Sequence, residues 1–472
     1  MAKVLVVGGG IVGLCGATLL ARDGHEVTVI ERDAEPPPTS PLEAWGSWQR
    51  RGVNQFRQLH YFLPNFRQTV EVELPDLAVA LETAGALRFN PLRAIPPDRT
   101  GGWREEDARF DTITGRRPMV EATVAAAVAA EPGVTVRRGT AVTGLQVDGD
   151  MPHAEVVGVA IDTGEVIGAD VVVDAGGRRS PMANLLAAAG MTPPQEERHD
   201  HGFVYYARHF RAADGSVPTP IGPLLQPCGS VSIVTLPADN GYWGVGIVAS
   251  ARDETARSLR RVEVWERVLK SFPLVAHWQD GECISDDVEI MAKIEDRYRH
   301  FCVDGQPVAP GVLPLGDAFA CTNPSLGRGA SIGLRHAVAL RDLLRTTDLD
   351  DRGAVSLAWD DVTAQTVGPY VRDTLTFDEH RLNEIEAVIA GTQYATDDPS
   401  YHLGRALNAA AFADRELLRL YLDVVSVHAR GVDVLSQPGI AERVIPFGAG
   451  LDAGPMPYVG PDRDELVSLL RA

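Results

Sequence analysis

The residues with the clearest chemical meaning form a glycine-rich turn near the N-terminus. Gly8, Gly10 and Gly13 follow a short apolar run, and Glu31 stands eighteen residues after Gly13. Glycines at this spacing let the backbone turn tightly and approach a pyrophosphate at a helix N-terminus, while the later acid accepts hydrogen bonds from ribose hydroxyls. The pattern therefore predicts a site for a dinucleotide that contains adenine.

One turn of this kind does not distinguish FAD from NAD. Arg32, next to Glu31, suggests a partner for a 2′-phosphate, but a solvated arginine beside the acid is the simpler interpretation. A second glycine pattern, Gly244-Val245-Gly246, lies inside an expected strand rather than between a strand and a helix. We therefore predict one dinucleotide motif rather than two.

The elements that hold the glycine turn are expected to form a βαβ unit. Residues Lys3–Val7 and Glu26–Ile30 have the short apolar pattern of buried strands, and Ile11–Arg22 between them has helical spacing. The same patterns predict helices at Asp76–Ala84, Met119–Ala130 and Gly329–Arg345, and strands at Val134–Arg138, Val142–Val147, Val156–Asp162, Val171–Asp174 and Val312–Leu315.

Between residues 202 and 290 the pattern changes to alternating strands, which predict an inserted antiparallel sheet. The expected elements are strands at Phe203–Phe210, Val231–Leu236 and Tyr242–Ala249 and a helix near Glu254–Phe272. Aromatic side chains gather here, although the chain is only 6% aromatic. Tyr205, Tyr206 and Trp243 are candidates for substrate contact. Because successive strand residues point to opposite faces, half of such side chains must miss the cavity.

Composition excludes several classes of protein. With 472 residues, 45% of them hydrophobic and 23% charged, the chain is neither disordered nor a disulfide-stapled miniprotein. A net charge of −20 argues against nucleic acid as a partner. The five cysteines lack metal-ligand spacing, so no zinc site or disulfide framework is expected and a reducing cytoplasm is the predicted location. The apolar stretch 4–21 contains five glycines, which an export signal would not favour, and no later stretch is long enough to span a bilayer.

Two further motifs follow the strand expected at Val312–Leu315. They are Gly316-Asp317-Ala318 and Pro324-Ser325-Leu326-Gly327-Arg328-Gly329, and the second precedes a helix. With the N-terminal glycines, the segment Arg117–Glu121 and the run Asp170–Ser180, they give the sequence an ordered set of motifs. In these motifs the chain resembles the FAD-dependent monooxygenases with the p-hydroxybenzoate hydroxylase fold, closest to the branch of styrene monooxygenases and flavin halogenases. The resemblance covers roughly residues 1–345.

The resemblance implies a fold and a domain division. The fold is α/β, with a Rossmann-type FAD-binding domain, an inserted antiparallel β-sheet that binds substrate, and a helical C-terminal region. The FAD-binding domain would comprise residues 1–90, 100–185 and 301–345, the substrate-binding layer 91–99 and 186–300, and the helical region 346–472. The C-terminal helices would either cap the active site or form a dimer interface, and periodicity does not separate these two roles.

The resemblance also implies how FAD is held. Asp317 would accept hydrogen bonds from the ribityl hydroxyls, and Gly327 and Gly329 would let the loop backbone contact the isoalloxazine. The helix that follows would point its positive end at the pyrimidine edge, where reduced flavin carries negative charge. Arg117 would lie near the cofactor phosphates. The remaining implied cofactor contacts are Val12, Arg32, Arg51, Val142, Asp174, Gly316, Pro324 and Arg328.

The reaction implied by the resemblance is transfer of one oxygen atom from O2 to a largely apolar small molecule, by epoxidation or hydroxylation through a flavin hydroperoxide. Electrons would come from NADH or NADPH, directly or through a separate flavin reductase. His60 is the candidate catalytic residue, and a structural or solvated histidine is the alternative. No lysine lies between Lys3 and Lys270 and the Trp-x-Trp-x-Ile-Pro stretch is absent, so a halogenase is not expected. The alternatives left open are a reductase or dehydrogenase of a carbon–carbon double bond and a flavin-dependent binding or sequestration protein.

Overall fold

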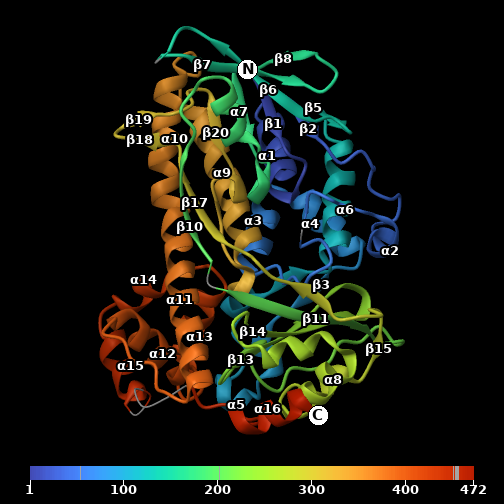
Figure 1. Ribbon diagram of the computed structural model, residues 1–472, viewed down its shortest axis with the longest axis vertical. Coiled ribbons are helices and arrows are strands. Elements are labelled where there is room, and N and C mark those ends of the chain that lie inside the picture. Colours follow the sequence, from blue (N-terminus) through green and yellow to red (C-terminus); the bar gives the residue numbers. More distant parts are fainter. Residues whose placement is uncertain (54, 152, 201, 450, 452–455) are drawn as a thin grey trace.

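A parallel sheet of five strands forms the centre of the upper half of the molecule (Figure 1). The computed structural model describes residues 1–53, 55–151, 153–200, 202–449, 451 and 456–472. The strand order is β20-β9-β1-β2-β5, and each neighbouring pair runs parallel. The strands are β1 (Lys3–Val7), β2 (Glu26–Glu31), β5 (Val134–Arg138), β9 (Val171–Asp174) and β20 (Val312–Pro314).

The two faces of this sheet are covered by different kinds of element. Alternate strand residues such as Val6, Val29 and Val173 pack against helices on one face. These helices are α1 (Ile11–Arg22), α3 (Pro64–Glu73), α4 (Pro75–Thr83), α6 (Arg117–Ala129), α9 (Gly329–Thr346) and α10 (Arg352–Thr366). The other face packs on an antiparallel sheet of β6 (Val142–Asp148), β7 (Glu155–Ile161) and β8 (Val166–Gly168) and on helix α7 (Met182–Ala188).

A six-stranded antiparallel sheet lies below the parallel one. Its order is β12-β13-β14-β11-β15, and β16 also pairs with β11. The strands are β11 (Phe203–Arg211), β12 (Leu225–Cys228), β13 (Val231–Pro237), β14 (Tyr242–Ser250), β15 (Glu282–Cys283) and β16 (Glu289–Met291). Helices α8 (Val262–Lys270) and α16 (Arg463–Arg471) cover one face, and α11 (Gly368–Ala390) lies against the other.

Smaller elements join the two halves. A three-stranded antiparallel sheet of β10 (Gln195–His199), β17 (Asp296–His300) and β21 (Ala320–Cys321) runs between them, and a short hairpin pairs β3 (Leu87–Phe89) with β4 (Thr112–Thr114). The C-terminal helices α12 (Pro399–Ala411), α13 (Arg415–Val425), α14 (Gly431–Leu435) and α15 (Ile440–Gly448) form a separate group at the lower end (Figure 1). Among the described residues, no helix combines the length and the apolar character needed to cross a membrane.

The C-terminal region does not stand apart from the other two regions. Val355 and Trp359 of α10 belong to the core that also contains strands β1, β2 and β9. Leu466 and Leu470 of α16 complete the core beneath the six-stranded sheet. The division at residue 345 remains a prediction as a domain boundary, but the packing continues across it.

The structure corrects several predicted boundaries. The helix expected near Glu254–Phe272 is a 3-10 turn, Thr255–Arg260, followed by α8. Asp253 ends the preceding strand region by accepting hydrogen bonds from Thr255, and this side chain also pairs with Arg463. Helix α6 begins at Arg117, two residues before the predicted start, because a proline is tolerated in the first turn of a helix.

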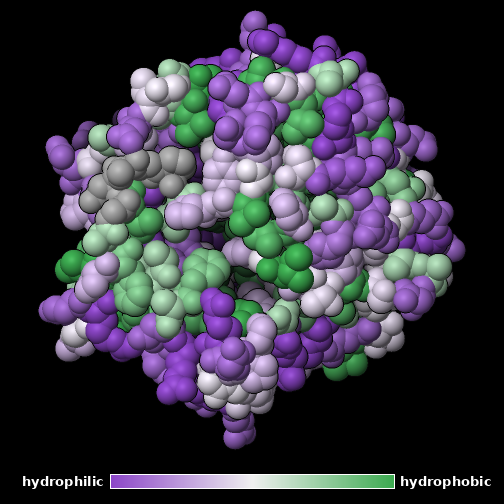
Figure 2. Space-filling model, turned by 90° about the horizontal axis from the view of Figure 1, so that it is seen from below, coloured by the Kyte–Doolittle hydropathy of each residue, from purple (hydrophilic) through white to green (hydrophobic). Residues whose placement is uncertain are grey.

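Figure 2 shows the lower face of the molecule, where the C-terminal helices and the six-stranded sheet meet. A hollow opens near the centre of this face. Hydrophobic side chains gather beside the hollow, whereas hydrophilic residues dominate the outer rim. An apolar border around an opening is typical of the entrance to a ligand site.

Candidate functional site

The turn between β1 and α1 is closed on one side and open on the other. Gly8 has φ +116°, and a Cβ built on it would lie 2.3 Å from the carbonyl oxygen of Ala175. A Cβ on Gly13 would lie 2.3 Å from the carbonyl oxygen of Gly8. A Cβ on Gly10 would meet nothing within 4 Å. The turn therefore requires glycine at two positions for its own packing and leaves clear space at the third, in front of the N-terminus of α1.

Glu31, at the end of β2, is anchored beside this turn. Its Oε2 accepts hydrogen bonds from the Gly9 N–H at 2.9 Å and from Arg50 at 2.7 Å, and its Oε1 accepts from the Asp33 N–H at 2.8 Å. The buried Arg50 also pairs with Glu121 at 3.0 Å and donates to the Gly9 carbonyl. Three donors leave the Glu31 carboxylate further acceptor capacity. An arginine at this depth is compensated because three carboxylates surround it.

Arg117 and His60 form a pair near the start of α6. Arg117 Nη1 donates to His60 Nε2 at 3.2 Å, and the His60 Nδ1–H donates to the Gln58 carbonyl at 2.9 Å. Burial, reinforced by the Arg117 charge, lowers the pKa of His60 to about 3. His60 is therefore neutral at ordinary pH, with its accepting nitrogen engaged by a permanent cation. This environment suits a residue that orients Arg117 and does not suit a proton donor.

Asp317 lies across the same region from Arg117. The turn Gly316–Ala318 follows β20, and Gly316 has φ +59° and rests on Val12 of α1. The Asp317 side chain is exposed, yet the surrounding protein desolvates it enough to raise its pKa, against the charges of Arg117, Arg178 and Arg299. A carboxylate that is both accessible and desolvated lines a recess within the protein. The two segments that carry Gly8–Gly13 and Asp317 are thus side by side.

The loop Pro324–Gly329 continues this recess toward the N-terminus of α9. Gly327 has φ +64° and closes a 3-10 turn in the left-handed conformation that favours glycine. A Cβ on Gly329 would meet nothing within 4 Å, as at Gly10. Gly333, one turn further along α9, lies against Val12 with so little room that a Cβ would be 2.5 Å from its Cγ2. Helices α1 and α9 therefore start close together. Each begins beside a glycine, Gly10 or Gly329, that has free space around its Cβ position.

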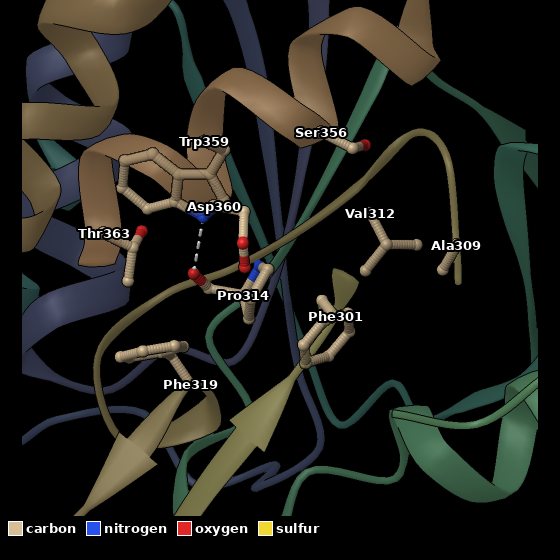
Figure 3. Close-up of a pocket in the computed structure, with 9 residues that line it drawn as sticks. All are labelled: Phe301, Ala309, Val312, Pro314, Phe319, Ser356, Trp359, Asp360 and Thr363. Carbon is tan, nitrogen blue, oxygen red and sulfur yellow. Dashed lines mark hydrogen bonds between the residues drawn. The ribbon is translucent and has the colours of Figure 1, made fainter. Parts of the chain in front are cut away.

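Helix α10 supports the strand and turn that precede this loop (Figure 3). The Trp359 Nε1–H donates to the Pro314 carbonyl at 2.9 Å, and the indole stacks on His336 with ring centroids 4.4 Å apart. His336 Nδ1 accepts from the Gly316 N–H at 3.1 Å, and its Nε2 contacts the Thr363 hydroxyl at 2.9 Å. Complete burial lowers the pKa of His336 to about 3, so the ring is neutral. The small cavity of Figure 3, about 10 Å³, is a packing gap behind this turn.

Comparison with known proteins assigns the fold. The model of the FAD binding domain family matches residues 1–347, about three quarters of the chain. The chain belongs to this family. Curated relatives include Protein Rv3254 of Mycobacterium tuberculosis, 26% identical over 390 residues that cover 77% of each chain. A second is the 3-demethoxyubiquinol 3-hydroxylase of Escherichia coli, 25% identical over 365 residues, covering 72% of this chain and 79% of the relative.

Solved structures share the same fold. The structure of pqsL, a probable FAD-dependent monooxygenase from Pseudomonas aeruginosa, has a TM-score of 0.58 at 19% identity and covers 82% of this chain and 96% of that one. OxyS anhydrotetracycline hydroxylase from Streptomyces rimosus has a TM-score of 0.54 at 17% identity, covering 90% and 76%. The predicted fold class is confirmed, and so, at the level of the family, is the prediction of an FAD-dependent oxidoreductase.

The residues present fit FAD. The two open glycines, Gly10 and Gly329, leave space in front of two helix N-termini, where the positive ends of the helix dipoles favour a pyrophosphate and an anionic flavin edge. Glu31 has the acceptor capacity that ribose hydroxyls require, and Asp317 faces the recess between the two turns. FAD would therefore lie with its adenosine end at Glu31 and its flavin end toward Gly329.

The other predicted cofactor residues stay predictions, and the structure gives their surroundings. Asp174 is buried, and its carboxylate accepts from the Gly176 N–H at 3.0 Å and the Ser180 hydroxyl at 2.6 Å, so it shapes the turn after β9. Arg32 and Arg51 are exposed. Val142 begins β6 and packs partly buried against the core of the other sheet face. Pro324 begins the 3-10 turn of the α9 loop, and Arg328 contacts Thr374 of α11 at 3.4 Å.

The three predicted substrate residues divide between the two faces of the six-stranded sheet. Tyr205 faces α11 and donates to Asn323 Oδ1, beside the α9 loop, at 2.6 Å. Tyr206 and Trp243 face α8 on the other side, within the core that contains Trp265. The structure thus brings Tyr205 to the recess and keeps Tyr206 and Trp243 behind the sheet.

Several residues that stabilise the site were not predicted from the sequence. Arg50 pairs with Glu31, whereas its neighbour Arg51, the predicted cofactor contact, is exposed. Arg299 of β17 donates to the carbonyls of Asp317 at 3.2 Å and Ala318 at 2.8 Å. His336 lies inside an ordinary helical pattern. No spacing rule connects these residues to their partners, because each contact joins elements that are distant in the chain.

Proposed function

We propose that this chain is an FAD-dependent monooxygenase that transfers one oxygen atom from O2 to a largely apolar small molecule. The observation that carries the proposal is the position of the six-stranded sheet relative to the recess. Its inner face, through Tyr205, reaches the loop at the start of α9, where the flavin end of FAD would lie. The E. coli relative, a 3-demethoxyubiquinol 3-hydroxylase by its name, supports hydroxylation as the type of reaction.

The substrate would lie where the inner face of this sheet meets the α9 loop, beside the cluster that this face forms with helix α11. Phe203, Tyr205 and Val248 of the sheet meet Leu382 and Ile385 of α11 in one apolar cluster. Such a surface favours an apolar ligand, because burial of nonpolar area contributes about 25 cal/mol for each Å² removed from water. A hollow with hydrophobic side chains beside it opens on the lower face of the molecule (Figure 2), and it would give a route for entry. The aromatic side chains behind the sheet, Tyr206 and Trp243 among them, support the sheet and do not select the substrate.

The protein's own contribution is binding, orientation and exclusion of water. Bound FAD in its reduced form supplies the activation of O2. Arg117, oriented by His60, would hold the pyrophosphate, and Asp317 would hold the ribityl chain. Neither His60 nor His209 supplies a proton near neutral pH, because burial lowers the pKa of each to about 3. Epoxidation needs proximity and no strong base, so it is consistent with two histidines that stay neutral. Hydroxylation would need a base from another group near the substrate.

The test reduces the bound flavin without oxygen, using NADH, NADPH or a separate flavin reductase in turn. Oxygen labelled with 18O is then admitted in the presence of alkenes, phenols or indoles. We expect one labelled oxygen atom in the organic product, and the effective reductant identifies the electron supply. Turnover without oxygen would contradict the proposal and indicate a reductase of carbon–carbon double bonds. A stable ligand complex that gives no product under either condition would indicate a binding protein. The Gly10→Ala variant, which is expected to fold without holding FAD, is the control.

A further inference from the structure

Helix α11 connects the predicted flavin loop with the predicted substrate sheet. Its buried positions recur along one face. Thr374 contacts Arg328 at the start of α9, and Asp378 accepts a hydrogen bond from the Ser325 hydroxyl at 2.5 Å. One turn further on, Arg381 donates to the Ser232 hydroxyl at 3.0 Å and to the carbonyl of Val231 at 2.7 Å, both on β13. The same side of one helix thus contacts both regions.

Asp378 is the unusual member of this face. Its side chain is completely buried, and its Oδ2 makes no hydrogen bond of good geometry, although the amide of Asn323 lies close enough to affect its charge. Buried acids that lack a strong cationic partner are costly as carboxylates. A valine or leucine would fill such a position at no electrostatic cost, so a carboxyl group here calls for an explanation beyond packing.

We propose that Asp378 is a positioning residue that fixes the loop Pro324–Gly329 through Ser325, so that helix α11 sets the geometry of the flavin end of the site. The inference rests on the proposed placement of the isoalloxazine at this loop. Asp296 of β17 secures the same loop one step earlier, because its Oδ1 accepts the N–H of Asn323. Two acids from different elements therefore hold this part of the chain by hydrogen bonds, Asp296 at Asn323 and Asp378 at Ser325.

Burial favours the neutral form of Asp378, and the polar and charged groups around it act in both directions. Burial raises the pKa of Asp378 well above its usual value, and the nearby Asp296 raises it further, whereas the Ser325 hydroxyl, the Asn323 amide and the Arg328 guanidinium oppose the shift. Asp296 is itself raised, by burial, to a pKa of about 6. The Tyr205 hydroxyl, from β11, faces the same cluster, and the Asp378 charge would raise its pKa. As pH rises, ionisation of Asp378 therefore adds a second negative charge beneath the loop.

The expected consequence is a loop that loosens at high pH. A neutral Asp378 presents a carbonyl oxygen to Ser325 and a hydroxyl at Oδ2, and an asparagine side chain has the same shape without the ability to ionise. Asp378→Asn should therefore bind FAD as the wild type does at low pH and keep that affinity at high pH, where the wild type weakens. Asp378→Ala removes the acceptor and should weaken FAD binding by about five- to tenfold at every pH, as loss of one buried hydrogen bond does.

The experiment measures FAD dissociation constants and the visible spectrum of bound flavin from pH 5 to pH 9. It compares wild type, Asp378→Asn, Asp378→Ala and Ser325→Ala with Glu379→Gln, which makes the same kind of change at an exposed site one residue away. Support requires that Ser325→Ala and Asp378→Ala both weaken FAD binding at low pH, that Glu379→Gln matches wild type, and that neither Asp378 variant loses affinity where the wild type does as pH rises. Equal affinities for Asp378→Ala and Glu379→Gln would overturn the inference.

A further variant separates this inference from the proposed function. Asp317→Asn alters the turn that would hold the ribityl chain and does not contact α11. If Asp317→Asn weakens FAD binding about tenfold and the Asp378 variants do not, only the role of Asp378 is wrong. If Asp317→Asn leaves FAD affinity unchanged, the placement of FAD is wrong and the inference falls with it. Should Asp378→Ala fail to fold, Ser325→Ala, which removes the same hydrogen bond, still decides the question.

Discussion

The turns at the starts of α1 and α9 look alike in sequence but are held in place differently. Each presents an open glycine, Gly10 or Gly329, in front of a helix N-terminus. The α1 turn is built by its own βαβ unit and by the charges around Glu31. The α9 loop and the turn before it depend on β17, β11 and helices α10 and α11, through Arg299, Tyr205, Trp359 and Asp378. The nucleotide end is thus a local structure, and the flavin end is assembled from most of the chain.

The largest effect on the local turn is expected from Arg50→Met. This change leaves Glu31 buried without its cation and removes one of the two arginines that pair with Glu121, and breaking a buried pair in this way costs about 3–5 kcal/mol. Chemical denaturation of the protein without FAD measures the loss. The matched control is Arg51→Met, which changes an exposed neighbour and should alter stability by less than about 0.5 kcal/mol. Equal losses from the two variants would show that the carboxylates are not held by Arg50.

Two glycine variants separate the contribution of the α1 turn to stability from its contribution to FAD binding. Gly8→Ala places a Cβ 2.3 Å from the Ala175 carbonyl at φ +116° and should destabilise the protein by about 3 kcal/mol. Gly10→Ala meets no atom within 4 Å and should leave the stability of the protein without FAD within about 0.5 kcal/mol. Its Cβ would occupy the space for the pyrophosphate, so FAD affinity should fall by more than about a hundredfold, about 2.8 kcal/mol. Flavin fluorescence titration measures the affinity, and tight FAD binding by Gly10→Ala would contradict the placement of the cofactor.

The contacts that support the start of α9 are best tested through the pH dependence of the protein's stability. His336 has a pKa of about 3 in the folded protein, below the value of about 6.5 that an unfolded histidine has. The folded state therefore binds fewer protons between these values, and the stability from this group is present above pH 6.5 and is lost as pH falls toward 3. Acidification from pH 7 to pH 5 should cost about 2 kcal/mol through His336 alone.

His336→Gln should remove that part of the pH dependence while lowering stability at pH 7. Denaturation midpoints for wild type and variant at pH 5, 6 and 7 give the difference in slope. His60 and His209 contribute slopes of the same sign, since burial lowers each pKa to about 3, and they remain in both proteins as an internal reference. Parallel pH profiles for wild type and His336→Gln would mean that the ring is not the buried neutral group that supports the Gly316 turn.

The contrast between the locally built α1 turn and the α9 loop, which distant elements hold, also explains how much of the site the sequence predicts. Strand Lys3–Val7 and helix Ile11–Arg22 were predicted with the bounds that the structure has, because apolar period and glycine spacing are local signals. The three-stranded sheet of β10, β17 and β21 was missed, since its strands are short and polar and no hydrophobic alternation marks them. Its Arg299 nevertheless holds the turn of Asp317. The family motifs thus locate the flavin turns, and the contacts that hold them carry no motif.

The substrate side shows a related limit. Alternation along β11 required that Tyr205 and Tyr206 point to opposite faces, and it could not say which face meets the flavin. That choice depends on where α8 and α11 pack, and α8 is a short helix with a strongly apolar side that takes the Tyr206 face. Tyr206 and Trp243 lie in the core beside α8, and their contact with substrate stays a prediction. The catalytic assignment of His60 stays a prediction, and its surroundings argue for a role in orienting Arg117.

The smallest effect is expected from the two tyrosines of β11, which test whether the sheet helps to hold the α9 loop. Tyr205→Phe removes a buried hydrogen bond of 2.6 Å and leaves Asn323 Oδ1 without its donor, at a cost of about 1–2 kcal/mol in stability. Tyr206→Phe keeps the ring packed against α8 and should cost less than about 0.5 kcal/mol. Because Asn323 directly precedes the loop, Tyr205→Phe should also shift the visible spectrum of bound FAD, and Tyr206→Phe should not. Identical flavin spectra for both variants, measured alongside their unfolding curves, would mean that the sheet contributes packing to the α9 loop and no control over its geometry.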